Sequence, residues 1–421
     1  MSEERGPIHL ERVLLVVEQR NREDGSFIAF DINHIEGPIK CSGLVENIEF
    51  FYYGDYGSNC DETLINYCLE KKPQAVFLSL QSMSSRDGGI TPEAVRKITH
   101  QLHIPTVLFW FSIYADSIAE LLKSYLHSVS LNMILGADAS SHKPMPLEGT
   151  NYIYAGLTFD ENLFSTPDGV RDIPVGLLGS LVAFRRQWID RLKEFGIPVH
   201  TGGGQLVEGG DTSFSTGKAP PLWLSYEEYL RLTSRLKIVL NFSSGMGPMH
   251  LPAVSFTGQA ERSLVRLASQ VRGGLSALVK NPGRLKYIIP AMKHVASVTV
   301  KKPREMTRAR VYEALWCRTF LLEEYNPITA RYFELYVDYV PFTTLNDLVD
   351  KIRYYLKNDE ERDRIRLQGR ATIEKYYNAR IYWENIFEAI GIPSDNQFRH
   401  HPGEIWNKAH FENWLLSAGT R

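Results

Sequence analysis

Two glutamates, Glu305 and Glu313, flank the start of a predicted helix. Thr307 is a favourable N-cap residue, so the helix is predicted to begin at Arg308. Glu305 then lies in the preceding loop and Glu313 on the second turn. Carboxylates accept hydrogen bonds from neighbouring hydroxyls, which suits a loop carboxylate on a sugar and a helical one on a ribose. Arg308 and Arg310 add positive charge where the helix N-terminus already favours a diphosphate. The alternative is a charged helix start with ordinary ion pairs.

A glycine–serine loop offers a second place for an anion. The apolar segment 175–180 is a predicted strand that ends in Gly179 and Ser180, with a helix predicted soon after. Ligands of open α/β sheets bind beyond the carboxyl ends of the strands, where backbone N–H groups can hold a phosphate. Arg185 and Arg186 follow closely enough to neutralise a diphosphate. Because the full G-x-G-x-x-G pattern is missing, a plain turn with a solvated arginine pair is the alternative.

Between residues 243 and 300 the predicted strands stop and the chain becomes basic, with Glu261 as its single acid. The basic residues are Arg262, Arg266, Arg272, Lys280, Arg284, Lys286 and Lys293. One hypothesis is that residues 262–293 contact a membrane surface or polyanion, such as a lipid-linked acceptor. The other is a solvated helical flap, because the apolar residues keep a helical spacing that more often faces protein.

Short apolar runs alternate with amphipathic segments through residues 1–168, the expected first lobe. Predicted strands are 13–17, 75–80, 106–111, 132–135 and 153–157. Thr91 and Pro92 are typical of a helix start. Continuous apolar runs separated by helices predict a parallel sheet that is covered on both faces.

The same alternation restarts after a turn-rich stretch at 165–169, the predicted linker. Predicted strands are 175–180, 197–200, 237–242, 320–323 and 337–342, and predicted helices include 184–195, one that opens at Ser225, and one after Leu345. A second Rossmann-like sheet is therefore expected over residues 169–375. Asn241 and Ser244 lie at a strand's carboxyl end, where they could contact base or phosphate. Residues 376–421 are expected to form helices that cross back to the first lobe.

Composition narrows the class of protein. The 421 residues carry a formal net charge of −2, which argues against a nucleic-acid-coating protein. The four cysteines show no zinc spacing and are typical of free thiols in a reducing compartment. No apolar run reaches the roughly 18 residues of a transmembrane helix, and the N-terminal apolar run is too short for a signal peptide. A cytoplasmic protein is expected, with any membrane association peripheral and at the inner face.

The stretch EALWCRTFLL, which begins at Glu313, resembles the E-A-x-x-C/A-G-x-x-x-L signature of GT-B glycosyltransferases with a group-1-type C-terminal domain. The resemblance is to the spore-maturation-protein-like (CgeB-type) branch. Residues 175–180 followed by Arg185, the strand KIVLNF at 237–242 and residues 347–356 also resemble that branch. The resemblance covers about residues 175–387 with the 243–300 interruption, whereas the first lobe matches only in its β/α plan.

This resemblance implies two Rossmann-like lobes with a nucleotide-sugar cleft between them. Glu313 would then bind the donor's ribose, and Glu305 would match the first carboxylate of the E-x7-E pattern, which contacts the donor sugar. Arg318 departs from the glycine of the signature, and Glu305 lacks the usual flanking Gly-Phe-Gly. These departures leave the retaining or inverting outcome open.

An inverting enzyme of this fold needs a base from the first lobe that deprotonates the acceptor hydroxyl. Asp116 and His34 are candidates because they follow predicted strands or lie in loops near the cleft, as does Asp87. His250 is a further candidate from the second lobe. Each of them is alternatively an ordinary surface or capping residue.

We therefore expect a glycosyltransferase that moves a sugar from a nucleotide-diphosphate donor, such as a UDP-sugar, to a glycan, lipid-linked or protein acceptor. The resemblance implies that arginines and helix dipoles, and no metal, neutralise the leaving diphosphate, and no D-x-D motif is evident. No cofactor beyond the nucleotide sugar and no nucleic acid are expected, and the oligomeric state is open. A catalytically inactive sugar-nucleotide-binding or assembly protein, motivated by Arg318, and a sugar-nucleotide epimerase are the alternatives.

Overall fold

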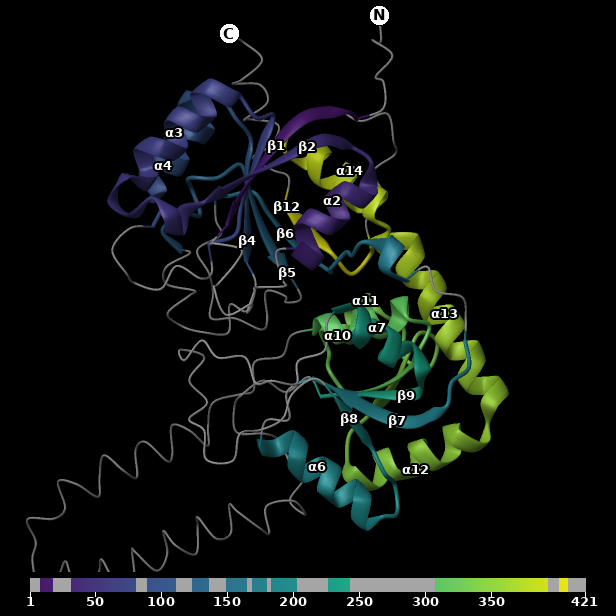
Figure 1. The fold of residues 1–421 in the computed structure, drawn as a ribbon. Coiled ribbons are helices and arrows are strands. Elements are labelled where there is room, and N and C mark those ends of the chain that lie inside the picture. The colour runs from purple at the N-terminus through teal and green to yellow at the C-terminus, as the bar shows by residue number, and fades with distance from the viewer. Residues whose placement is uncertain are drawn as a thin grey trace, which may run out of the picture.

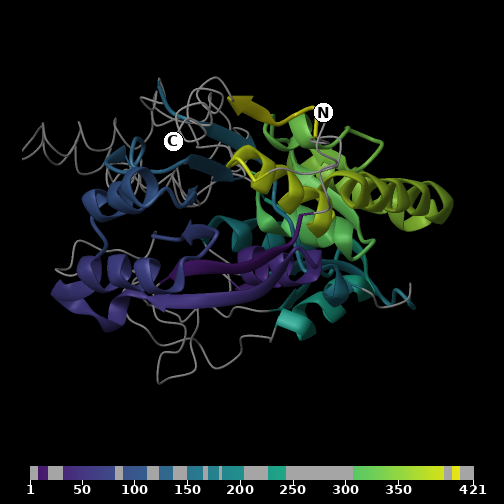
Figure 2. The ribbon, with the colours of Figure 1, turned by 90° about the horizontal axis from the view of Figure 1, so that it is seen from above.

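Two parallel sheets organise the chain (Figure 1). The structure, a computed structural model, describes residues 8–17, 32–80, 89–110, 123–135, 149–164, 169–179, 183–202, 226–242, 307–392 and 401–407. Each sheet lies between helices and forms its own lobe, and α13 runs along one side of the molecule from the second lobe toward the first. The view from above, in Figure 2, shows α14 lying against the N-terminal lobe.

The N-terminal sheet, within the described residues, has the strand order β12-β6-β5-β4-β3-β1-β2 and is parallel except for β12. Its strands are β1 (Leu10–Val17), β2 (Val45–Tyr52), β3 (Ala75–Leu78), β4 (Thr106–Trp110), β5 (Leu131–Leu135), β6 (Tyr152–Ala155) and β12 (Ile405–Asn407). Its helical segments are η1 (Ile32–Glu36), α2 (Gly37–Ser42), η2 (Tyr53–Asp55), η3 (Gly57–Asn59), α3 (Cys60–Lys71), α4 (Pro92–Arg96), η4 (Lys97–Gln101) and η5 (Glu161–Phe164). The Thr91 side chain accepts a hydrogen bond from the Ala94 amide, so the predicted helix start is confirmed.

The strands of this sheet are apolar throughout because both of its faces are buried. Consecutive side chains of a strand point to opposite faces. Leu15 of β1 therefore joins the core cluster that includes α14, whereas its neighbour Val16 joins the cluster under α3 and α4. The continuous apolar runs that predicted the sheet reflect this two-sided burial.

The C-terminal sheet has the order β11-β10-β9-β7-β8 among the described residues, with every pairing parallel. The elements of this lobe are β7 (Ile173–Leu178), α6 (Ala183–Glu194), β8 (His200–Gly202), α7 (Tyr226–Arg235), β9 (Leu236–Asn241), α10 (Ala309–Trp316), β10 (Phe320–Glu324), α11 (Thr329–Tyr332), β11 (Val340–Phe342), α12 (Leu345–Lys357) and α13 (Asp359–Tyr377). The next helix, α14 (Ala379–Ala389), follows them in the chain. The strand predicted at 197–200 begins only at His200. No helix in the described ranges is long and apolar enough to cross a membrane.

The chain returns to the N-terminal lobe through α13 and α14. Trp383 of α14 is fully buried and packs edge-on against Phe77, with ring centroids 5.2 Å apart, and against Phe109 at 6.2 Å. Farther along, β12 pairs with β6 at Ile405 and Tyr154. The last described segments thus complete the N-terminal core.

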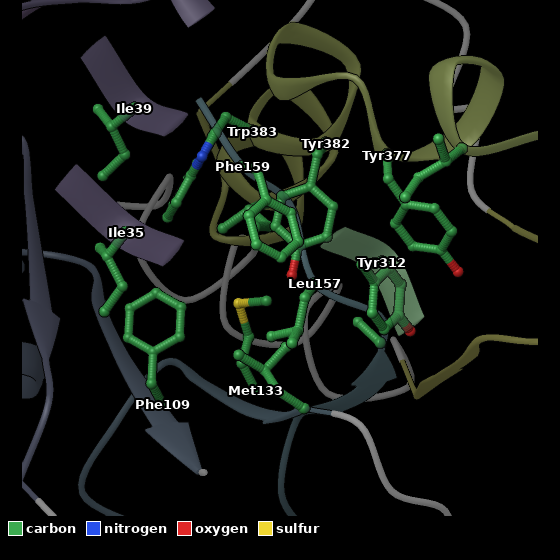
Figure 3. Close-up of a cluster of buried hydrophobic side chains, with 14 of the residues drawn as sticks. Ile35, Ile39, Phe109, Met133, Leu157, Phe159, Tyr312, Tyr377, Tyr382 and Trp383 are labelled. Carbon is green, nitrogen blue, oxygen red and sulfur yellow. The ribbon is translucent and has the colours of Figure 1, made fainter. Parts of the chain in front are cut away.

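An aromatic cluster fills the junction between the lobes (Figure 3). Tyr312 of α10 meets Tyr377 at the end of α13 at right angles, with centroids 5.3 Å apart. Gly156 follows β6 at this point, and a Cβ there would lie 2.7 Å from the Tyr312 hydroxyl. The Tyr382 hydroxyl donates to the Gly156 carbonyl at 3.0 Å. Helix α10 is therefore packed directly against the first lobe through Tyr312.

Candidate functional site

The carboxyl ends of three neighbouring strands, β7, β9 and β10, meet the N-terminus of α10. The chain runs from β7 to β8 on one side and then crosses to β9 on the other, so the strand order reverses beside β7. Open α/β sheets bind ligands beyond the carboxyl ends of their strands at such a reversal. The candidate site is therefore the surface between Gly179, Asn241 and the start of α10.

Gly179 has a backbone conformation that suits glycine alone. Its φ is +110°, and a Cβ would collide with the Arg310 guanidinium. Its amide donates to the Gly202 carbonyl at 2.8 Å, which ties the end of β7 to β8. A side chain here would add backbone strain and would displace Arg310. Gly179 thus leaves room for a guanidinium at the end of β7.

Three arginines from two helix starts form the arginine cluster of this site: Arg185, Arg308 and Arg310. Arg310 donates to the Asn241 side-chain oxygen at 3.1 Å, and Arg185 donates to the Phe242 carbonyl at 3.4 Å. The pKa of Arg185 is lowered to about 9 by burial and by the positive charges of Arg310 and Arg308, whereas Glu324 acts in the opposite direction. Like charges are held together here at a helix N-terminus, which suits a polyanionic ligand.

Glu313 lies behind this surface and is 7% exposed. Tyr229 of α7 donates to one of its oxygens at 2.6 Å, and Tyr226 donates to the other at 3.2 Å. Burial raises the pKa of Glu313, while the two tyrosine hydrogen bonds and Arg310 counteract that rise. These contacts of Glu313 hold α7 against α10, and the binding of a donor ribose by Glu313 stays a prediction.

We expect Glu313→Ala to lower the free energy of unfolding by about 2–3 kcal/mol, because the hydroxyls of two partly buried tyrosines lose their acceptor. Urea unfolding followed by circular dichroism measures the change. Glu227→Ala is the control, since Glu227 is exposed on α7 and its loss should cost under about 0.5 kcal/mol. Equal stability of the two variants would show that the tyrosine contacts do not stabilise the fold.

The prediction that Thr307 is the N-cap of α10 is wrong by one residue. Arg308 occupies the N-cap position with extended backbone, and its side chain makes no capping hydrogen bond. Thr307 is buried, and its hydroxyl lies 3.2 Å from that of Thr329 on α11. Because that hydroxyl is engaged with α11, it does not cap the helix.

His34, a candidate base, lies in η1 and is 7% exposed. Its ring packs edge-on against Phe159 with centroids 4.6 Å apart. Burial lowers the pKa of His34 to about 3, although a hydrogen bond with the Thr158 backbone opposes the shift. A neutral imidazole in this environment is a weak proton acceptor, so the structure gives no support to His34 as the base.

Several predicted site residues lie outside the described residues: Asp116, Glu305, Ser180 and Ser244, with Asp87, His250 and the basic segment 243–300. The structure brings together Gly179, Arg185, Asn241, Arg308 and Arg310. The structure adds Glu323 to the site. This residue is not among those predicted from the sequence, although Glu323 and Glu324 form a visible pair of acids at the end of an apolar strand. In the described ranges, no three His, Cys, Asp or Glu side chains gather as a metal site.

Comparison with known proteins supports this architecture. Residues 283–388 match a family model described as "Glycosyl transferase-like". A comparison with curated proteins finds no match.

Among solved structures, Anabaena Alr3699/HepE in complex with UDP-glucose is similar, with a TM-score of 0.50 and 12% identity over 91% of this chain and 99% of that one. The same protein with UDP and glucose gives the same values. A glycosyltransferase from Rickettsia africae ESF-5 gives 0.48 and 8% identity over 90% and 98%.

The CgeB-type branch stays a prediction that rests on the sequence motifs. The sheet topology, the site at the strand ends and the similarity to the Anabaena structure agree on a broader conclusion. The chain has the GT-B fold, and its residues 283–388 are similar to a glycosyl transferase-like family model.

Proposed function

We propose that the protein is a glycosyltransferase that holds the diphosphate of a nucleotide-sugar donor at the arginine cluster. The observation that carries the proposal is that Arg185, Arg308 and Arg310 gather at the start of α10, where Arg310 lies against Gly179 and donates to Asn241. Guanidinium groups and backbone amides together bind phosphate oxygens strongly. The family match over residues 283–388 includes α10 and agrees with this assignment.

The chemistry of this site is stabilisation of a leaving group. When an acceptor hydroxyl attacks the anomeric carbon, the bond from that carbon to the diphosphate oxygen breaks, and negative charge collects on the diphosphate. Fixed guanidinium groups favour that charge, which lowers the barrier without any rearrangement of solvent. The hydroxyl proton passes to a base, for which Asp116 remains the candidate from the first lobe.

UDP is the first donor nucleotide to test, because the similar Anabaena structure contains UDP-glucose. The acceptor class stays a proposal of a glycan, lipid or protein, with residues 262–293 as a contact for a membrane-bound acceptor. The nucleotide sugar is the only co-substrate we propose, and the arginine cluster takes the place of a metal ion.

The experiment is a comparison of two adjacent arginines on α6. Arg185 is part of the arginine cluster, whereas Arg186 is exposed. We expect wild-type protein to release UDP from a UDP-sugar, with water or an acceptor panel as the second substrate. Arg185→Ala should slow the release at least tenfold, about 1.4 kcal/mol in transition-state stabilisation, and Arg186→Ala should leave it within about twofold.

Equal rates for the two variants would contradict the proposed site. UDP binding without release on any acceptor would favour the inactive binding protein. Conversion of the donor sugar without UDP release would favour the epimerase.

A further inference from the structure

A buried chain of hydrogen bonds lies behind the arginine cluster and centres on Glu323 of β10, which is fully buried. Its Oε1 accepts from the Asn241 amide at 3.2 Å and from the Thr329 hydroxyl at 3.0 Å. The Thr307 hydroxyl lies 3.2 Å from that of Thr329. One carboxyl oxygen thus connects β9, β10, α11 and the residue that precedes the α10 cap.

Asn241 links Glu323 to the arginine cluster through hydrogen bonds at both ends of its side chain. Its amide group donates to Glu323, and its carbonyl oxygen accepts from Arg310 at 3.1 Å. An asparagine side chain has a donor end and an acceptor end, so the acceptor at Glu323 determines which end faces Arg310. Without that acceptor, Asn241 could rotate and present its donor end to the guanidinium.

Burial raises the pKa of Glu323 to about 8, and Glu324 raises it as well, while Thr329, Asn241 and Arg308 lower it. The carboxyl group is therefore mostly neutral at pH 7 and mostly ionised at pH 9. Its Oε2 is buried and makes no hydrogen bond within the described part of the chain.

The charged and titratable groups around Glu323 lie on several segments. Glu324 lies next to it on β10, Arg308 at the N-cap of α10 lowers its pKa, and Arg185 of α6 interacts with Glu324. Tyr339 precedes β11, and burial raises its pKa, with the charge of Glu323 as a further cause. Between pH 7 and 9 the charge of Glu323 changes, and Arg185, with a pKa of about 9, begins to lose its charge in the same range. Arg185 is common to wild type and to the Glu323 variants, so a difference between their pH profiles reports on Glu323.

We propose that Glu323 is a positioning residue for the diphosphate: as a neutral carboxylic acid, it orients Asn241 and, through it, Arg310. This inference rests on the proposed function, because it assumes that a diphosphate binds at the arginine cluster. A neutral acid supplies the acceptor that Asn241 needs without setting a negative charge behind the ligand. An ionised Glu323 would repel the diphosphate, so binding favours the protonated form and takes up a proton near pH 8.

The test is calorimetric titration of UDP into wild-type protein, Glu323→Gln and Glu323→Leu at pH 7, 8 and 9. Above pH 7 the terminal phosphate of UDP is already largely ionised, since such groups titrate near pH 6. Wild-type affinity should fall about fivefold more than that of Glu323→Gln between pH 7 and 9, which is the change that one pKa unit of coupling from a pKa of about 8 gives over this range. Glu323→Gln should bind within about threefold of wild type at pH 7, because it keeps a neutral acceptor.

Glu323→Leu removes the acceptor and should weaken binding about tenfold at every pH, by the loss of one oriented charged hydrogen bond. Parallel pH profiles of wild type and Glu323→Gln would overturn the inference while leaving the donor site intact, and so would wild-type affinity in a folded Glu323→Leu. Failure of all three proteins to bind UDP would instead overturn the proposed function, and the inference with it.

Discussion

Replacing Arg310 by alanine is expected to weaken UDP binding by about 100-fold, or about 2.7 kcal/mol. Arg310 donates to Asn241, and its guanidinium fills the space where a Cβ at position 179 would stand, so it lies at the centre of the proposed diphosphate site. Truncation removes its charge and its planar donor fork and leaves Asn241 without its donor. Isothermal titration calorimetry measures the loss.

Arg310→Lys is the matched variant, because it keeps the positive charge and loses the fork. Its affinity should fall between those of wild type and Arg310→Ala, since an ammonium group binds phosphate as a point charge. Circular dichroism and thermal unfolding check that each variant is folded. Full affinity in a folded Arg310→Ala would show that UDP does not use this cluster.

Trp383→Ala is expected to lower the free energy of unfolding by about 3–5 kcal/mol, the range for large buried aromatic residues. The Trp383 ring packs against Phe77 and Phe109 of the first lobe, although it belongs to a helix that follows the second lobe in the chain. Its loss opens a cavity at the place where α14 is anchored. The shift of the urea midpoint measures this cost.

The control is Leu367→Ala on α13, where the side chain is 47% exposed. Removing it should change the unfolding free energy by about 0.5 kcal/mol or less. If Trp383→Ala unfolded at the same urea concentration as Leu367→Ala, α14 would not hold the first lobe together.

The sequence predicts the central strands well because their signal is local. β1 and β4 are short apolar runs that are buried on both faces, and no other element type explains them as well. β2 was not predicted: its segment, VENIEFFY, mixes charged and apolar residues because it is an edge strand with one paired side. The three-residue strand β12 depends on pairing with β6, and no local sequence pattern predicts that long-range pairing.

The site residues were predictable where polar or charged side chains stand at the ends of predicted strands. Gly179 and Asn241 lie at the ends of predicted strands, and the arginines lie at the starts of predicted helices, so parallel topology alone brings them together. Glu323 was missed because an acid at the end of a strand usually faces solvent, and only the packing of α11 over it reveals its burial. Thr307 was misassigned for the same reason, since its partner on α11 is distant in sequence.

Arg318 shows that a departure from a sequence motif can leave the backbone unchanged. Its φ is +53°, the left-handed conformation that explains why the resembled signature has glycine there. The Thr319 amide still donates to the Ala314 carbonyl at 2.9 Å and closes the end of α10. The arginine costs on the order of 1 kcal/mol in strain at the end of the helix opposite the arginine cluster. It therefore gives no reason to expect an inactive site.

The central claim is that the arginine cluster binds a nucleotide through its diphosphate. The most direct measurement is calorimetric titration of wild-type protein with UDP and, in parallel, with uridine, which keeps the base and ribose but lacks the diphosphate. The account predicts that UDP binds at least about 100-fold more tightly than uridine, because the charge-assisted contacts are to the phosphates. Equal affinity for the two ligands, or no binding of UDP, would contradict it.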